Sequence, residues 1–291
     1  MVREGLAYQW RLPEKADDAV VQDLAAALNV SLPLAEVLYH RGYRTRDACL
    51  AFLFTPEEIV ADGSLLKDAD RAVDRIITAI KNNEKILIAG DYDVDGVTSS
   101  ALMMRCLLEL DAPVNFFLPN RIRDGYGLSV KTVERAARNG YTVILTVDNG
   151  ITAFDPAQRA KELGIDLIIT DHHRPLDRGL PPAYAIVDPH QADCAYPFKG
   201  FAGVGVSFKL MTLLYQRLSR ELPDDVYELL TLGTIADVVP LLDENRYYVR
   251  EGLRRIAHAE SFALRVLKEN ARLHDKKLSS LDIGFYIAPQ I

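Results

Sequence analysis

Cysteine is scarce in this sequence. The 291 residues include only three, Cys49, Cys106 and Cys194, and no two of them form a C-x-x-C pair. An odd and scattered set supports neither a disulfide framework nor a zinc knuckle. We therefore expect ordinary buried or partly buried thiols in a protein of a reducing compartment.

Long apolar runs and excess positive charge are lacking as well. No run reaches membrane-spanning length and the N-terminus has no apolar signal-peptide core, which predicts a cytoplasmic protein without a membrane partner. Lysine and arginine number 34 against 41 aspartates and glutamates, a net charge of −7. This balance argues against a generally basic surface and weakly against nucleic acid as a partner, but it is compatible with a local basic groove.

Hydrophobic residues, in contrast, make up 49% of the chain, enough for a substantial core. Up to residue 78 the pattern is mostly helical, with helices expected over 17–30, where Asp17 is a candidate cap, 45–54 and 68–83. From Lys85 short apolar runs alternate with helical stretches. Strands are expected at 85–90, 114–119, 141–147, 165–170 and 184–188, and helices at 97–110, 129–140, 154–164, 208–222 and 224–242. The alternation predicts an α/β fold, a mainly parallel sheet flanked by helices, with helical N-terminal and C-terminal extensions.

The stretch "AGDYDVDG" carries three alternating aspartates followed by a glycine. Alternation of this kind begins a calcium-binding EF-hand loop. That interpretation fails because Leu102 stands where the closing glutamate belongs, and because an apolar strand precedes the loop instead of a helix. If the extended geometry continues past the strand, Asp91, Asp93 and Asp95 present their carboxylates to one side.

Polar residues also follow two further expected strands. Asp148 comes after "TVILTV", and "IDLIIT" is followed by Asp171, His172 and His173. The carboxyl ends of parallel strands meet at one sheet edge, where ligands bind in open α/β folds. Burying several carboxylates together is costly unless a cation neutralises them, so we predict a metal site. Mostly carboxylate ligands favour manganese or magnesium over zinc, and four or more aspartates indicate two ions, as in phosphoryl hydrolysis.

Each of these residues alone has a simpler explanation. A single aspartate after a strand is usually a helix cap or a turn residue, and a lone histidine is usually structural. Capping does not explain two adjacent histidines beside three acidic strand ends, so the joint pattern favours the metal site. The other four histidines show no partner pattern and are taken as structural: His40, His190, His258 and His274.

Four segments resemble, in order, the motifs of the DHH phosphoesterases: "GDYDVDGVTS", "VDNGI", "TDHH" and "GTIADVVPL". Within that superfamily they are most similar to the RecJ single-strand DNA exonucleases, as are "PNRIRDGYGLS", "YPFKGFAGVGVSFKL" and "ENRYYVREGL". The resemblance covers most of the chain. It implies an N-terminal helical segment at 1–78, a DHH catalytic domain at 79–240 and the start of a helical connector at 241–291.

The resemblance also implies roles for individual residues. Two manganese or magnesium ions would be bound by five side chains: Asp93, Asp95, Asp148, His172 and Asp237. Asp148 would bridge the two ions, and His173 would bind the scissile phosphate or assist the leaving group. Asp237 lies in a helical stretch and is indicated by the family motif alone.

Two features depart from the family pattern. Many DHH phosphoesterases have a histidine four residues before the first ligand aspartate, where this sequence has Ala89. Asp91 either compensates as a ligand or lies behind the ligands, a position for which Asp171 is also a candidate, and the sequence leaves both open. Family members also bind substrate between two lobes, and the final "IAPQI" resembles the start of a motif leading into the second, DHHA1-type lobe. We therefore expect an N-terminal catalytic part without that lobe.

Substrate contacts are expected from the loop after the second strand of the sheet and from a glycine-containing helix start. Basic and aromatic side chains of such a loop suit a single strand, and a helix N-terminus binds phosphate. Solvated loop charge and glycine packing in the core are alternatives of equal weight. The candidates are Arg121, Arg123, Tyr126, Gly203, Gly205 and Lys209.

The resulting hypothesis is a metal-dependent phosphodiesterase that removes mononucleotides from the 5′ end of single-stranded DNA. It would act as a monomer in DNA repair and recombination, together with a single-strand-binding protein and a repair helicase. One alternative is a DHH hydrolase of short oligoribonucleotides or cyclic dinucleotides, against which the helical N-terminus and the RecJ-type segments count. Another is a non-catalytic replication scaffold of the same fold, against which the intact acidic motifs count.

Overall fold

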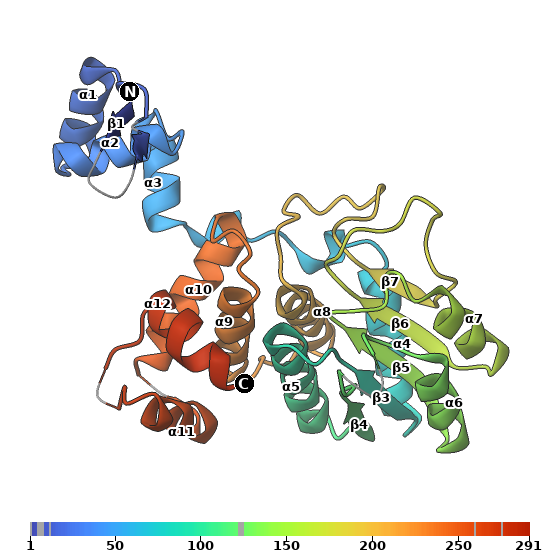
Figure 1. Ribbon diagram of the computed structural model, residues 1–291. Coiled ribbons are helices and arrows are strands. Elements are labelled where there is room, and N and C mark those ends of the chain that lie inside the picture. Colours follow the sequence, from blue (N-terminus) through green and yellow to red (C-terminus); the bar gives the residue numbers. More distant parts are fainter. Residues whose placement is uncertain (1, 5–8, 12, 122–124, 259, 275) are drawn as a thin grey trace. The chain divides into compact units, whose positions relative to one another are not determined.

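The structure is a computed structural model that describes residues 2–4, 9–11, 13–121, 125–258, 260–274 and 276–291 (Figure 1). The chain folds as two compact units, Met1–Ile59 and Val60–Ile291. The boundary expected at residue 78 falls inside helix α4 (Ala69–Lys81), whose buried Ala72 and Ile76 belong to the core of the second unit. The chain also does not divide at residue 240.

In its described residues, the first unit contains two short strands, three helices and the short helical turn Glu57–Ile59. Its elements are β1 (Val2–Glu4), β2 (Gln9–Arg11), α1 (Asp18–Leu28), α2 (Leu32–His40) and α3 (Arg46–Phe54). Asp17 caps α1, as predicted, by accepting hydrogen bonds from the N–H groups of Ala19 and Val20. The antiparallel pair β1–β2 and helix α2 were not predicted.

No single helix of the described residues is long and apolar enough to cross a membrane. Helices α1 and α2 reach the length and composition of a membrane span only when they are taken together, and this pair is bent by 116°.

The second unit is built around a five-stranded parallel sheet, which confirms the predicted α/β class. The strand order is β4-β3-β5-β6-β7. The strands are β3 (Lys85–Ala89), β4 (Val114–Phe117), β5 (Tyr141–Val147), β6 (Asp166–Thr170) and β7 (Ala185–Val187). Each of the five apolar runs identified in the sequence supplies one of them.

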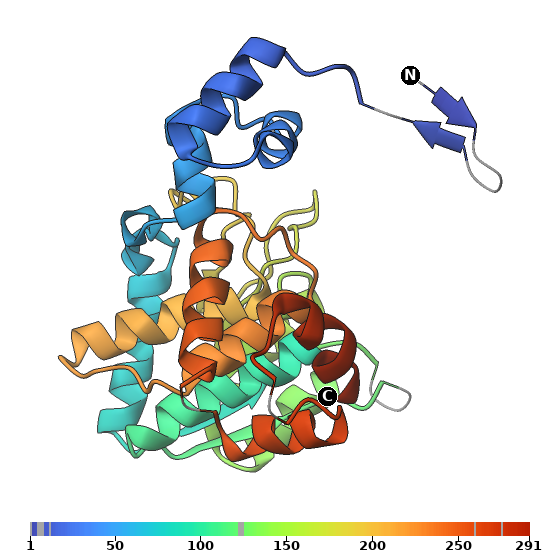
Figure 2. The same cartoon turned by 90° about the vertical axis from the view of Figure 1, so that its left-hand side faces the viewer.

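Helices cover both faces of this sheet. Besides α4, the unit contains α5 (Val94–Glu109), α6 (Val130–Arg138), α7 (Phe154–Glu162), α8 (Gly203–Arg217), α9 (Val226–Ala236), α10 (Asp243–Ile256), α11 (Phe262–Asn270) and α12 (Ser280–Asp282). Short helical turns are formed by Gly63–Leu65, Ile283–Ile287 and Ala288–Gln290. In Figure 1, α9 and α10 lie on the side of α5 and α8 that is away from the sheet. This side faces the viewer in Figure 2.

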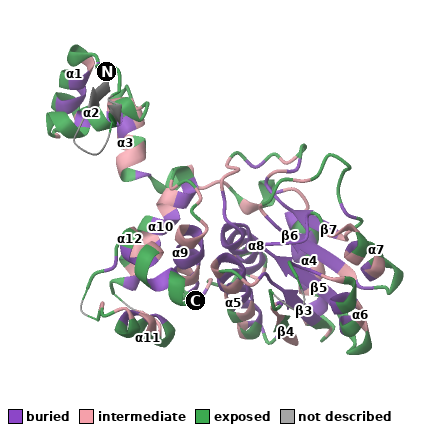
Figure 3. Ribbon diagram, viewed as in Figure 1, coloured by how far each residue is buried: buried purple, intermediate pink, exposed green. Residues whose placement is uncertain are grey.

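Side chains alternate between two hydrophobic cores along each central strand. In β3, Ile86 and Ile88 pack with α4, α5 and α8, whereas Leu87 and Ala89 pack with α6 and α7. The strands are therefore buried on both sides (Figure 3), which explains their continuous apolar character. A further core joins α9 to the C-terminal helices through residues such as Leu232 and Ile283.

The connections diverge at β3 and β5. Helix α5, after β3, lies on one face of the sheet, whereas α6 and α7, on either side of β5 in the chain, lie on the other. Such a reversal leaves a crevice at the carboxyl ends of the two strands, where open α/β sheets bind ligands. The aspartate-rich loop after β3 and Asp148 after β5 both lie at this point.

Lys209 lies in the interior of the second unit, which corrects its expected role as a substrate residue. Its side chain is only 3% exposed, and its ammonium donates to the carbonyl of Ala61 at 2.5 Å and lies 3.4 Å from Glu244. The Tyr196 hydroxyl donates to the same carboxylate at 2.8 Å, and the Tyr248 hydroxyl completes the cluster. This polar network ties α8 to α10 and to the chain before α4, so Lys209 does not reach a substrate.

Removing one partner of this network should destabilise the protein strongly. Lys209→Met leaves the Glu244 carboxylate buried without a cation, which should lower the free energy of unfolding by about 3–5 kcal/mol. Adding Glu244→Gln to the same chain should restore most of the loss, because the uncompensated charge is then gone. Urea denaturation measures both, with the exposed Lys131→Met as control. A loss no larger than that of Lys131→Met would contradict the assignment.

Candidate metal centre at the carboxyl ends of the sheet

The loop after β3 turns directly into α5. Asp93 is the N-cap of this helix, where its Oδ1 accepts a hydrogen bond from the Gly96 N–H at 3.0 Å, and Asp95 lies in the first turn. The extended strand ends at Ala89, so the expected alternation along a continuing strand is not what gathers the carboxylates. A strand, a tight turn and a capped helix bring them together instead.

The N-terminus of α8 binds Asp95. The buried carboxylate accepts hydrogen bonds from the backbone N–H groups of Gly203, at 2.5 Å, and Val204, at 2.8 Å. The Gly205 N–H donates to the carbonyl of Ala202. These N–H groups were expected to hold a substrate phosphate, and the structure corrects this because they are engaged within the protein. A helix N-terminus stabilises a carboxylate for the same reason that it stabilises a phosphate.

Asp148 follows β5 with a left-handed backbone, at φ 60°. This conformation brings its side chain against α8: a Cβ added to Gly203 would lie 2.6 Å from the Asp148 Cβ and 2.8 Å from its Oδ1. Position 203 therefore requires glycine. The next residue, Asn149, donates from its amide nitrogen to the carbonyls of Ala89, at 3.0 Å, and Val147, at 2.9 Å, and so fixes the ends of β3 and β5.

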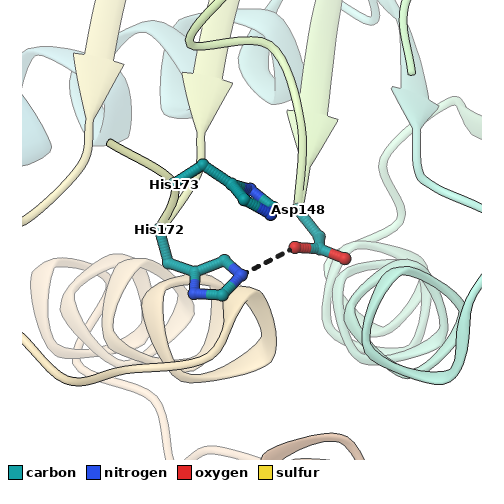
Figure 4. Close-up of side chains that lie close together, drawn as sticks. All are labelled: Asp148, His172 and His173. Carbon is teal, nitrogen blue, oxygen red and sulfur yellow. Dashed lines mark ion pairs between the residues drawn. The ribbon is translucent and has the colours of Figure 1, made fainter. Parts of the chain in front are cut away.

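One nitrogen of His172 faces three carboxylates from three different elements. Its Nε2 lies 3.1 Å from Oδ1 of Asp148, 3.8 Å from Oδ2 of Asp95 and 3.7 Å from Oδ2 of Asp237. Figure 4 shows the ring directed at Asp148 from the loop after β6. Asp237 is the C-cap of α9, so a helix remote in sequence delivers the residue that only the family motif indicated.

Asp171 holds the turn that carries both histidines. Its Oδ1 accepts from the backbone N–H groups of His172, at 2.7 Å, and His173, at 3.1 Å, and lies 2.7 Å from Nδ1 of His173; its Oδ2 accepts from the Ile151 N–H at 2.9 Å. Although burial favours the neutral acid, the hydrogen bond and charge of His173 keep the pKa of Asp171 below its ordinary value. The same hydrogen bond raises the pKa of His173. Both oxygens of Asp171 are thus occupied, and it orients its neighbours.

The remaining carboxylates are crowded and poorly satisfied. Burial raises the pKa of Asp148, and the charges of Asp95 and Asp93 raise it further. Burial likewise raises the pKa values of Asp91, Asp95 and Asp237. Among the described residues, buried oxygens without a hydrogen-bond partner are found at Oδ1 of Asp91, Oδ1 of Asp148 and Oδ2 of Asp237. These features fit a site that receives positive charge.

The ligand atoms form three overlapping groups. Within each group, one atom per residue lies within 4.8 Å of the others. The groups are Asp91–Asp93–Asp148, Asp95–His172–Asp237 and Asp148–His172–His173. Asp148 belongs to two of them, which suits a ligand shared between two ions. A donor set of carboxylates with one or two imidazoles suits magnesium or manganese.

Two of the expected substrate residues border this centre. The Tyr126 hydroxyl donates to the Asp148 carbonyl at 3.3 Å, and its ring meets the His173 ring edge-on, with centroids 6.3 Å apart. Arg121 is exposed at the start of the same loop. Arg123 lies outside the described residues.

Comparison with known proteins agrees with this geometry. A profile of the DHH family, N-terminal domain, matches residues 85–234. The chain belongs to the DHH family. Its DHH relatives include the single-stranded-DNA-specific exonuclease RecJ of Bacillus subtilis (strain 168), 40% identical over 97% of this chain and 35% of that protein. RecJ of Thermus thermophilus is 33% identical over 97% of this chain and 40% of that protein.

Solved structures of RecJ exonucleases also match this chain. The structure of Thermus thermophilus RecJ in complex with Mn2+ matches with a TM-score of 0.80 and 32% identity, over 97% of this chain and 40% of that one. A structure of exonuclease RecJ bound to manganese matches with a TM-score of 0.72 and 34% identity, over 81% of this chain and 58% of that one. The chain thus spans less than half the length of the two curated RecJ relatives, from Bacillus subtilis and Thermus thermophilus.

Two residues that contribute to this site were not predicted from the sequence. Asp188 follows β7 and is fully buried, with Oδ2 unpartnered among the described residues; burial raises its pKa to about 7. The rule that marked the other strand ends applies equally to "YAIVD" and would have found it. Asn149 is the second, because its Oδ1 also accepts from the Leu128 N–H and so anchors the Tyr126 loop. A long-range contact of this kind leaves no signal in the sequence.

Neutralising one crowded carboxylate should stabilise the protein when metal is absent. Asp148→Asn keeps a side chain that tolerates the left-handed backbone and removes a repelled charge, so the free energy of unfolding in EDTA at pH 8 should rise by about 1–3 kcal/mol. The raised pKa means that the folded protein binds the extra proton, so the stability of the parent falls as pH rises and the gain should shrink toward pH 4. Urea denaturation across this pH range measures it.

The matched control is Asp111→Asn, since Asp111 is exposed and also left-handed, at φ 56°. It should leave stability unchanged. Manganese titration by calorimetry should show weaker binding for Asp148→Asn and parent-like binding for the control. Equal manganese affinity in all three proteins would rule out Asp148 as a ligand.

Proposed function

We propose that this chain is the catalytic part of a metal-dependent phosphodiesterase that hydrolyses single-stranded DNA from the 5′ end to mononucleotides. The observation that carries the proposal is the convergence of five aspartates and two histidines from the segments after β3, β5 and β6 and from the end of α9, with unsatisfied buried oxygens among them. The relatives named as single-stranded-DNA-specific exonucleases support the substrate. Because the chain spans less than half of them, their activity is attributed to it as a proposal.

Two manganese or magnesium ions would be held by the residues of the first two ligand groups. Asp91, Asp93 and Asp148 would hold one, and Asp95, His172 and Asp237 the other; Asp148 would be shared, because it also lies beside His172 in the third group. In this assignment Asp91 is a direct ligand, which makes up for Ala89 at the position of the usual family histidine. When bound, such ions supply positive charge to the phosphate and lower the pKa of an attacking water.

His173 would contact the scissile phosphate. Asp171 holds its Nδ1 side, and the side chain remains 48% exposed, so its other nitrogen is available to a substrate. The raised pKa favours the protonated ring, which can donate a hydrogen bond and charge to the phosphate or to the leaving oxygen. Tyr126 stays neutral beside it, because burial and the nearby carboxylates raise its pKa.

We expect a cytoplasmic monomer that works with a single-strand-binding protein and a helicase in DNA repair. The domain scheme of a helical N-terminal part, a DHH domain and a connector is part of this proposal.

A direct assay tests the function. With manganese, the protein should release mononucleotides from 5′-labelled single-stranded DNA, and it should act more slowly on RNA, duplex DNA and cyclic dinucleotides. Thin-layer chromatography separates the products, and a 3′-labelled strand reports the polarity. Asp148→Asn should abolish release. Faster cleavage of oligoribonucleotides or cyclic dinucleotides would replace the substrate assignment, and inactivity on all substrates despite manganese binding would favour a scaffold.

The two histidines should separate metal binding from catalysis. His173→Ala should lower kcat about 10²–10⁴-fold while leaving manganese affinity close to the parent, because His173 is held by Asp171 and faces the substrate side. His172→Ala should instead weaken manganese binding, since its Nε2 faces three carboxylates. Calorimetry and single-strand hydrolysis measure the two effects. Equal loss of manganese from both variants would contradict the division.

A further inference from the structure

Tyr92 lies inside the metal centre's first motif and has no part in the cores. It stands between Asp91 and Asp93, which both belong to one ligand group. Its side chain is half-buried, and it belongs to none of the four hydrophobic clusters formed by the described residues; nor does Tyr126. Two large aromatic rings beside a phosphoryl-transfer site that pack into no core are available for a ligand.

The ring of Tyr92 is held in a row of aromatic and cationic groups. The Arg121 guanidinium lies 5.5 Å from its ring centroid, and the Tyr126 ring meets it edge-on at 6.4 Å. Tyr126 in turn meets His173 at 6.3 Å. The row therefore runs from the proposed phosphate-binding histidine to an exposed arginine. Aromatic faces and arginine planes are the groups on which single-stranded bases stack.

We propose that Tyr92 is the stacking surface for the nucleobase of the nucleotide being removed, with Arg121 fixing the ring. The inference rests on the proposed function and adds how the site distinguishes a nucleotide from a bare phosphodiester. A base is one sugar away from its phosphate, so a phosphate held beside Asp91 and Asp93 brings its base to the adjacent ring. Stacking of this kind accepts every base, because each has a π-face.

A hydroxyl function for Tyr92 is the competing explanation. A hydroxyl that donates to the phosphate would be lost in Tyr92→Phe, whereas a stacking ring would be retained. Replacement by alanine removes both. The two variants together therefore separate ring from hydroxyl, and a substrate without a base separates stacking from phosphate binding.

The experiment compares two single strands that differ only in the 5′ residue, thymidine or a tetrahydrofuran abasic analogue. Tyr92→Ala should raise KM for the thymidine strand roughly 5- to 100-fold and leave KM for the abasic strand unchanged. Tyr92→Phe should behave like the parent on both. A terminal 2-aminopurine should be quenched on binding to the parent and to Tyr92→Phe, but not to Tyr92→Ala, in the absence of turnover.

The matched control is Tyr184→Ala. Tyr184 also carries an arginine over its ring, with Arg71 at 4.4 Å, but it precedes β7 and so lies at the opposite end of the strands. It should leave both strands unaffected. Equal slowing of both strands by Tyr92→Ala, or loss in Tyr92→Phe, would overturn the proposal. A parent that cleaves neither strand would count against the proposed function instead, and the 2-aminopurine signal would still decide the stacking role.

Discussion

The hydrogen bonds from the N-terminus of α8 to the Asp95 carboxylate hold the centre together. They join α5, which follows the loop after β3, to a helix more than a hundred residues later in the chain. Gly203, which donates one of these hydrogen bonds, also lies directly against Asp148. Asp95, after β3, and Asp148, after β5, therefore both contact the start of α8. The positive end of the helix also offsets part of the charge that Asp95 brings into the interior. Helix α8 is thus a partner common to both strand ends, as His172 is.

A second set of contacts, around the Lys209 side chain, also holds α8 in place. Lys209, two turns along the helix, is bound inside the protein by Glu244 and the carbonyl of Ala61. The helix is thus fixed near its start by a carboxylate and further along by a buried ion pair. Such anchoring suits a site that crowds several like charges, because repulsion alone would move the ligands apart. The stability lost at the carboxylates is a cost that a bound cation would remove.

Features that depend on neighbouring residues could be predicted from the sequence, whereas features that depend on contacts between distant residues could not. The central strands were found because both of their faces are covered and each is a nearly continuous apolar run, and the polar residues at their ends followed from the same runs. Gly203 and Lys209 were misread, because their roles depend on Asp95 and Glu244, partners far away in the chain. The loop after β3 was expected to be extended, since nothing local showed that Asp93 caps a helix. Asp237 required a family motif, because the end of a helix carries no strand signal.

The residue after Asp237 shows how the last ligand is held. Val238 is left-handed, at φ 59°, and is 85% exposed, although this conformation is unfavourable for a β-branched residue by roughly 1–2 kcal/mol. Helices commonly end at such a position with glycine. The left-handed residue ends α9 with Asp237 as its C-cap, whose N–H still bonds to the Gly233 carbonyl, and so keeps the carboxylate at the helix end, 3.7 Å from His172. An exposed, strained valine contributes nothing to a core. We therefore attribute its left-handed conformation to the placement of the Asp237 carboxylate that precedes it.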